Sequence, residues 1–176
     1  STSFNGKKQV GNAFLVTKGT TGTDTPTPPT TGEDYKSNIS WKLGNKAYDN
    51  TSVDNSKQYA MVNGVEVTQI LKLGASSGAG TATLIIPKGT SKLSFYGFAW
   101  KGTEATLVAK VAGTEVAKEP LKSNDGVYKT PPYTITVTAS DLHTVNFPTK
   151  LPVDTEVEIT TEEAKGRVVL FGFKAE

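Results

Sequence analysis

The chain has 176 residues, a net charge of +2, a single His and no Cys. The absence of Cys excludes disulfides, thiol catalysis and thiolate metal sites. A nearly neutral charge with scattered Lys argues against a nucleic-acid partner, and no apolar run is long enough to cross a membrane. Many Thr, Gly and Pro residues are typical of short strands joined by tight turns.

The N-terminal part predicts a fragment followed by a linker. Residues 14–16, Phe-Leu-Val, form a short apolar run, and we interpret residues 1–19 as the C-terminal strands of a truncated preceding domain. Residues 20–34 are rich in Thr and Pro, which favours an extended, semi-stiff linker. Because the apolar run has no domain of its own here, we expect it to pair with a sheet edge by strand addition.

From Tyr35 onward the pattern is a succession of short strands, which defines a single domain over residues 35–176. The run NISWKL alternates, so Ile39, Trp41 and Leu43 are expected to be buried. Asn63-Gly64 between two alternating runs predicts a two-residue β-hairpin. No window shows the apolar period of a helix. Further runs of the same kind are TATLIIP, ATLVAKV, YTITVTAS, TEVEITT and RVVLFGFKA. The pattern therefore predicts an all-β sandwich or barrel.

The stretch SKLSFYGFAWKG, residues 91–102, raises a question about its rings. On a strand, Tyr96, Phe98 and Trp100 share one face, which is either a core or a platform on which a ligand stacks. Burying large rings is strongly favourable, so the core interpretation is preferred.

The final strand repeats this layout, because FYGFAWK and LFGFKAE share an aromatic-Gly-Phe centre. We therefore expect the two strands to be neighbours, with Tyr96, Phe98, Phe171 and Phe173 in one core. Two glycines, 97 and 172, would then open a groove on the opposite face.

Catalytic motifs are weak. His143 has no nucleophile motif beside it, and GASSGAG lacks the Lys of a phosphate loop. The acids of TEVEITT alternate like the solvent face of a strand. We therefore expect no enzymatic activity from this domain.

The loop DNTSVDNS permits two interpretations. Asp49 and Asp54 offer the oxygen ligands that Ca²⁺ prefers, and a structural Ca²⁺ is one hypothesis. Asx residues also form turns without any metal, which is the alternative.

The order of features resembles a known family. ISWKLGNKAY, VNGVEVTQILKLG, a Gly/Ser loop, TATLIIPKGTSKLSFYGFAWKG and RVVLFGFK resemble the galactose-binding-like jelly-roll modules of exported multidomain proteins of Bacteroidetes-type bacteria. The resemblance covers residues 35–176. It implies an antiparallel two-sheet jelly-roll sandwich, a structural Ca²⁺ in many cases, and glycan binding through loops at one end. The N-terminal segment is similar to the end of a small β-barrel domain.

The leading hypothesis is a non-catalytic glycan-binding module of a secreted or cell-surface protein. Its other partners would be further domains of the same chain. The alternatives are a structural spacer or docking domain, and an accessory domain of an enzyme such as a nuclease or glycosidase. The candidate contact residues combine rings with polar loop side chains: Tyr48, Trp100, Asn124, Asp125, Tyr128 and Tyr133.

Overall fold

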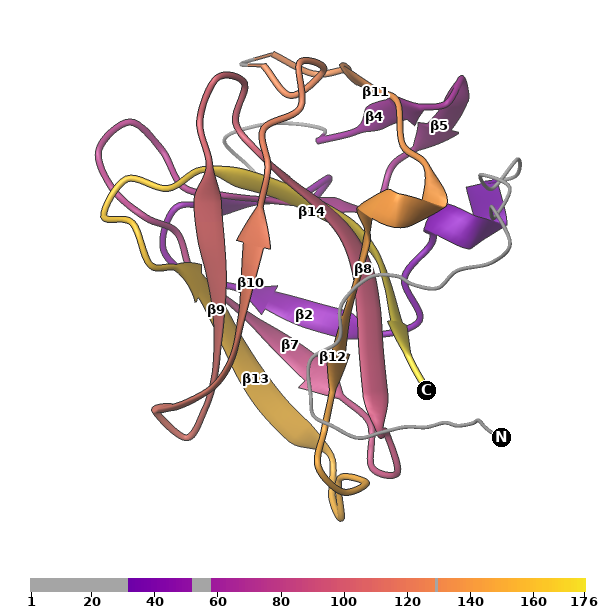
Figure 1. Ribbon diagram of the computed structural model, residues 1–176, viewed down its shortest axis with the longest axis vertical. Helices are drawn as coiled ribbons and strands as arrows, with labels where there is room; N and C mark the ends of the chain where they lie inside the picture. Colours follow the sequence, from indigo (N-terminus) through magenta and orange to yellow (C-terminus); the bar gives the residue numbers. More distant parts are fainter. Residues whose placement is uncertain (1–31, 52–57, 129) are drawn as a thin grey trace.

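The computed structural model describes residues 32–51, 58–128 and 130–176 (Figure 1). Within these ranges the secondary structure consists of strands and two short 3-10 helices, η1 (Gly32–Tyr35) and η2 (Ala139–Asp141). None of the described segments is a helix long and apolar enough to cross a membrane. The N-terminal fragment and linker residues up to 31 lie outside the described residues, so strand addition by residues 14–16 stays a prediction.

The first sheet is antiparallel and has the strand order β10-β9-β13-β7-β2. Its strands are β2 (Ser40–Leu43), β7 (Ala82–Ile86), β9 (Ala105–Val111), β10 (Thr114–Leu121) and β13 (Thr155–Thr161). Alternation decides which side chains face inward. In β7, the residues Ala82, Leu84 and Ile86 are buried, and in β13 Val157 and Ile159 are buried.

The second sheet is also antiparallel, with the order β12-β8-β14-β6-β3. Its strands are β3 (Ala47–Tyr48), β6 (Ile70–Leu73), β8 (Lys92–Ala99), β12 (Leu142–Asn146) and β14 (Val168–Ala175). The expected pairing of the two Gly-Phe strands is confirmed, because β8 and β14 are neighbours with Tyr96 opposite Phe171.

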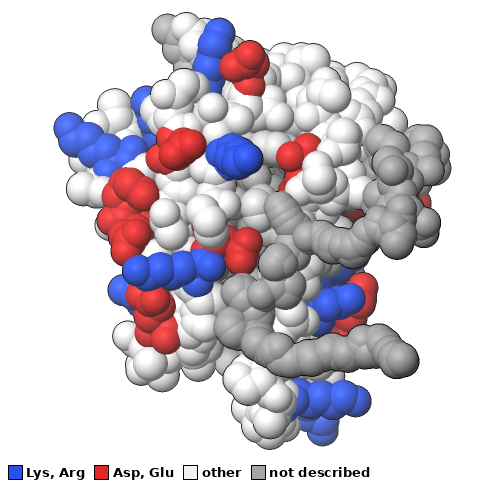
Figure 2. All heavy atoms as spheres, viewed as in Figure 1, with Lys and Arg blue, Asp and Glu red and all other residues white. Residues whose placement is uncertain are grey.

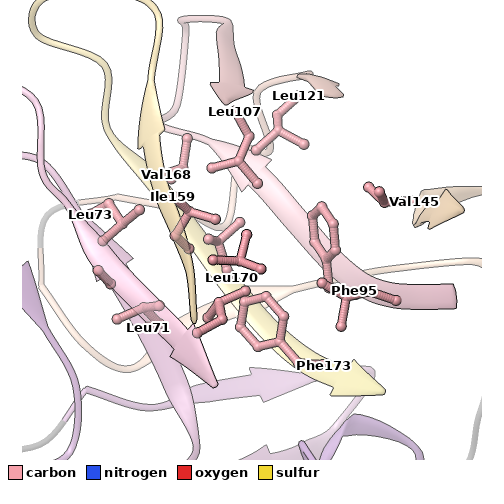
Figure 3. Packing of buried hydrophobic residues seen from close by; sticks show 14 of the residues in the cluster. Leu71, Leu73, Phe95, Leu107, Leu121, Val145, Ile159, Val168, Leu170 and Phe173 are labelled. Atoms are coloured by element: carbon pink, nitrogen blue, oxygen red, sulfur yellow. The ribbon is translucent and has the colours of Figure 1, made fainter. Parts of the chain in front are cut away.

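The two sheets pack face to face around one hydrophobic core, called the first core. Figure 3 shows Phe95 from β8 and Phe173 from β14 near Leu170, with side chains of β6 and β9 completing the packing. The predicted all-β, antiparallel two-sheet sandwich is therefore confirmed. Fully burying an aliphatic or aromatic side chain of this size stabilises a fold by about 1.5–3 kcal/mol.

A third, three-stranded sheet lies over the outer face of β8 and β14, and we call it the cap sheet (Figure 1). Its order is β11-β4-β5, with β11 parallel to β4. Its strands are β4 (Ala60–Val62), β5 (Val65–Val67) and β11 (Tyr133–Ile135). The predicted hairpin at Asn63-Gly64 joins β4 to β5, and both turn residues have the positive φ that such a turn requires.

Side chains between the cap sheet and the strands β8 and β14 form a second core. Tyr96, Phe98 and Trp100 all lie in it, together with Phe171 and Tyr35. Phe171 stacks on Tyr96 with ring centroids 5.5 Å apart. The ring face of the stretch 91–102 is therefore core and not a platform, as the preferred interpretation held.

One ring departs from the prediction. Phe173 does not join the other three, because the register of β14 against β8 shifts between Phe171 and Lys174. Gly172 sits at this irregularity with φ +67°, and the irregularity turns Phe173 into the first core. There its ring lies 5.6 Å from Phe95. The expectation of four rings in one core was wrong.

The predicted groove of paired glycines is also wrong. A side chain at Gly97 would meet Leu170 and Phe95 in the first core, whereas one at Gly172 would meet Tyr96 and Tyr35 in the second. The two glycines thus face opposite cores, and the space beside each is filled.

The edge strand β2 is less buried than its alternation suggested. Trp41 is half-buried and packs on Phe173 at 5.7 Å. Leu43 is 37 % exposed, so its predicted burial was wrong. Among the described strands, β2 is the last one of its sheet, so one of its edges is not paired by them.

Two tyrosines of the second core predict alkaline destabilisation. Burial raises the pKa of Tyr96 to about 12 and the pKa of Tyr133 to about 12. The folded state favours the neutral phenol, so this stability is complete below the ordinary pKa near 10 and is lost as pH rises toward about 12.

We expect unfolding midpoints in urea to fall between about pH 10 and 12, and less steeply in Tyr96→Phe. Phenolate absorbance provides the check. Full ionisation of every tyrosine by about pH 11 in a chain that is still folded would contradict the burial of these phenols.

Candidate functional site

One end of the sandwich, called the loop end, gathers loops from both sheets. It consists of residues 74–81, 100–104, 122–128 and 162–167, and in Figure 1 it is the end toward which β10 points. Backbone hydrogen bonds fix it. The Trp100 amide donates to the Arg167 carbonyl at 3.0 Å, and the Lys101 amide donates to the Val127 carbonyl at 3.0 Å.

Trp100 belongs to the second core and packs against the inner side of the loop end. Its side chain is only 6 % exposed, and its ring meets Tyr133 edge-on at 6.1 Å. Two cations lie against the indole, Lys72 Nζ at 5.0 Å and the Arg167 guanidinium carbon at 4.8 Å from its centroid. Trp100 was predicted to contact ligand directly. Protein groups already cover most of the ring, and the ligand contact itself stays a prediction.

Tyr133 is likewise inaccessible. It is 2 % exposed, and its hydroxyl donates to Gln58 Oε1 at 3.1 Å. Alternation in YTITVT places Tyr133, Ile135 and Val137 inside, and the structure confirms this. Its ring belongs to the second core, and its role as a ligand contact stays a prediction.

Tyr128 lies at the surface of the loop end, and the ring of Tyr48 lies beside it. Tyr128 is 53 % exposed, and Lys101 Nζ lies 5.3 Å from its ring centroid. Tyr48, on β3, is half-buried, and Lys72 Nζ lies 5.0 Å from its centroid. Lys72 thus stands between Tyr48 and Trp100. Each surface ring carries an ammonium group beside it.

Asn124 and Asp125 form the turn that precedes Tyr128. Asn124 Oδ1 accepts a hydrogen bond from the Gly126 amide at 2.8 Å, which is an Asx turn. Asp125 is exposed. A side chain at Gly126 would overlap the Thr134 carbonyl, so this loop packs tightly against β11. The structure brings both residues to the loop end, as predicted, while their contact with a ligand stays a prediction.

Two cations at the loop end and beside it, Arg167 and Lys72, were not singled out from the sequence. Lys72 lies on β6, where it pairs with Val169 of β14, and Arg167 directly precedes β14. Burial, and secondarily the positive charge of Arg167, lower the pKa of Lys72. Alternation alone marks Lys72 as outward-facing. Only the register of β6 against β14 brings it to Trp100.

The calcium hypothesis depends on a loop that is described only in part. Asp49 is buried, its Oδ2 accepts from Trp41 Nε1 at 2.8 Å, and its Oδ1 accepts from the Thr51 amide at 2.8 Å. Both oxygens thus have donors without a metal. In the described ranges no cluster of three metal-ligating side chains occurs, and Asp54 lies outside them. A Ca²⁺ at Asp49 and Asp54 stays a prediction.

His143 lies away from the loop end, on β12. It stacks on Phe95 at 5.4 Å, and its Nδ1 is 3.1 Å from Glu119 Oε1. The pair stands beside an apolar recess that is lined by Val116 and Ala117 of β10 and by Val145 of β12. Packing on Phe95 and the Glu119 carboxylate thus hold the His143 ring in place, which indicates a structural role for this His.

Comparison with known proteins gives distant similarities. No family model matches the chain, and no curated protein matches it. Among solved structures, a carbohydrate-binding module, CBM36, in complex with calcium and xylotriose is 15 % identical with a TM-score of 0.40, covering 82 % of this chain and 94 % of that one. TmCBM61 in complex with β-1,4-galactotriose is 10 % identical with a TM-score of 0.38, covering 81 % and 90 %.

An enzyme domain is similar at the same level. The enzymatically active domain of tailspike protein 4 of bacteriophage CBA120 is 14 % identical with a TM-score of 0.34, covering 83 % of this chain and 20 % of that one. At such identities and TM-scores the similarities assign neither a family nor a ligand to this chain.

Proposed function

We propose that this chain is a non-catalytic glycan-binding module of the galactose-binding-like kind, belonging to a secreted or cell-surface protein. The observation that carries the proposal is the loop end, where the ring of Tyr128 is 53 % exposed and a turn presents Asn124 and Asp125 beside it. A ring with an accessible surface stacks on the apolar face of a sugar, and nearby amides and acids bond to its hydroxyls.

The scaffold beneath this surface is rigid. Trp100 and Tyr133 hold the loop end from within the second core, and backbone hydrogen bonds join three of its loops. A preformed surface loses little entropy on binding. One sugar stacked on one ring gives millimolar affinity, about 4 kcal/mol, so such a module would act through avidity within a larger protein.

Affinity electrophoresis through gels containing neutral and acidic polysaccharides tests the proposal. We expect at least one polysaccharide to retard the full chain, and Tyr128→Ala to lose about tenfold in affinity, which corresponds to about 1.4 kcal/mol. Val153→Ala is the control, since Val153 is 60 % exposed in the loop before β13.

Absence of retardation by every polysaccharide would contradict glycan binding. It would favour the alternative that the sandwich is a spacer or docking domain. Retardation that is unchanged in Tyr128→Ala would move the site away from the loop end.

A further inference from the structure

We infer that the loop end binds an anionic glycan, with Lys72, Arg167 and Lys101 contacting a carboxylate or sulfate group on the sugar. This inference rests on the proposed function and adds the chemical class of its ligand. It follows from how the cations are placed.

Within the part of the chain that the structure describes, two positive charges lie at one indole and neither forms a salt bridge. Lys72 and Arg167 both lie within 5.0 Å of the Trp100 ring centroid. Ion pairs elsewhere use other cations, such as Lys42 with Glu156 and Lys118 with Glu162. Across residues 32–51, 58–128 and 130–176, no carboxylate forms a salt bridge with Lys72 or Arg167.

Such an arrangement is unfavourable for the free protein. The two like charges repel each other, and Lys72 is partly removed from water, so its charged form is disfavoured. The indole offers only partial compensation through cation–π attraction. An oxyanion placed between the two groups would relieve the repulsion and accept charge-assisted hydrogen bonds, which are the strong class of hydrogen bond.

The rings beside the cations indicate that this oxyanion is part of a sugar. Lys72 also lies 5.0 Å from the Tyr48 ring, and Lys101 lies 5.3 Å from the Tyr128 ring. Each site thus combines an aromatic surface for a pyranose with an ammonium group for a charge attached to it. A neutral sugar would use the ring alone and would leave both cations uncompensated.

The charge pattern does not favour nucleic acid. Figure 2 shows acidic and basic side chains interspersed over the visible face of the molecule, and the whole chain has a net charge of only +2. Nucleic-acid binding surfaces are extended basic patches or stripes. Two cations at one indole, Lys72 and Arg167, suit a single charged residue of a glycan.

The experiment compares matched ligands by titration of the full chain. The ligands are oligogalacturonate, a sulfated oligosaccharide and neutral β-1,4-galactan oligomers of equal length, with single-stranded DNA as a polyanion without exposed pyranose rings. The variants are Lys72→Met and Arg167→Gln. Lys150→Met is the control, because it removes the same charge from the exposed loop before β13.

We expect one of the acidic oligosaccharides to bind at least tenfold more tightly than galactan, and its identity distinguishes carboxylate from sulfate. Lys72→Met and Arg167→Gln should each weaken that binding about tenfold, with Lys150→Met within twofold of the parent chain. Raising salt from about 50 to 300 mM should weaken it further, since the contacts are ionic. In a Trp41→Phe background, the remaining Trp100 fluorescence should change on binding.

Two outcomes would overturn the inference. One is galactan binding equal to that of the acidic ligands and unaffected by Lys72→Met, which would leave glycan binding intact and remove its anionic character. The other is equal binding of DNA, which would show that charge alone is recognised.

Discussion

Replacement of Phe171 by Ala is expected to destabilise the protein by about 3–5 kcal/mol, the range for deleting a large aromatic side chain from a core. Phe171 is fully buried at the centre of the second core. Its ring stacks on Tyr96 at 5.5 Å and meets Tyr35 edge-on at 5.9 Å. Removing it would leave a cavity beneath the cap sheet that neighbouring aromatic rings cannot fill.

Urea denaturation measures the loss, and Phe173→Ala provides the matched comparison. Phe173 is equally buried but lies in the first core, so its replacement should cost a similar amount. Hydrogen exchange separates the two variants. Phe171→Ala should increase exchange in β4, β5 and β11, whereas Phe173→Ala should leave them protected below the global unfolding limit. Equal protection of these strands in both variants would contradict the division into two cores.

Gly74→Ala is expected to cost about 3 kcal/mol or more, because backbone strain of about 1–3 kcal/mol is combined with a steric overlap. Gly74 directly follows β6 and has φ +99°, a conformation that L-residues rarely adopt. A Cβ atom there would overlap the Gly166 carbonyl and crowd Arg167. The residue thus lets two loops of the loop end approach closely.

Gly113→Ala isolates the strain from the overlap. Gly113 has φ +82°, and a Cβ atom there would meet nothing within 4 Å. We expect about 1 kcal/mol from this replacement, which is the usual effect of a lost positive-φ glycine. The difference between the urea unfolding midpoints of the two variants then measures the effect of the steric overlap at Gly74. Identical losses would show that the loops are not in contact at Gly74.

Local patterns predict much of the sandwich. Alternation in TATLIIP and TEVEITT identifies the inward residues of β7 and β13, and Asn63-Gly64 identifies the hairpin. The repeated Gly-Phe motif identifies β8 and β14 as neighbours. These features were predictable because each depends on a few residues close together in sequence.

The cap sheet could not be predicted in this way. β11 pairs with β4 across a long separation, with Tyr133 opposite Ala60, and no local signal links the two segments. β8 carries apolar residues on both faces because this sheet covers one of them. Without knowledge of the cap sheet, only one face of β8 could be assigned to a core, and the face with Gly97 was interpreted as a groove.

The sequence indicated a surface loop at Tyr128, Asn124 and Asp125, because turn residues and an aromatic side chain lie there outside any strand pattern. The structure shows all three at the loop end, and their contact with a ligand stays a prediction. Trp100 directly follows β8, and its ring is covered by Lys72, Arg167 and Tyr133, which are distant from it in sequence. Their contribution follows from sheet register, which composition does not reveal.

Hydroxyl-radical footprinting of the full chain, free and with the polysaccharide that retards it most, tests the central claim that the loop end binds while the ring row of β8 is core. Tyr128 and Tyr48 should be oxidised in the free protein and protected in the complex. Tyr96, Phe98 and Phe171 should resist oxidation in both, because they are buried under the cap sheet. Oxidation of Tyr96 and Phe98 in the free chain, with their protection by the glycan, would contradict the account and make the ring row the platform.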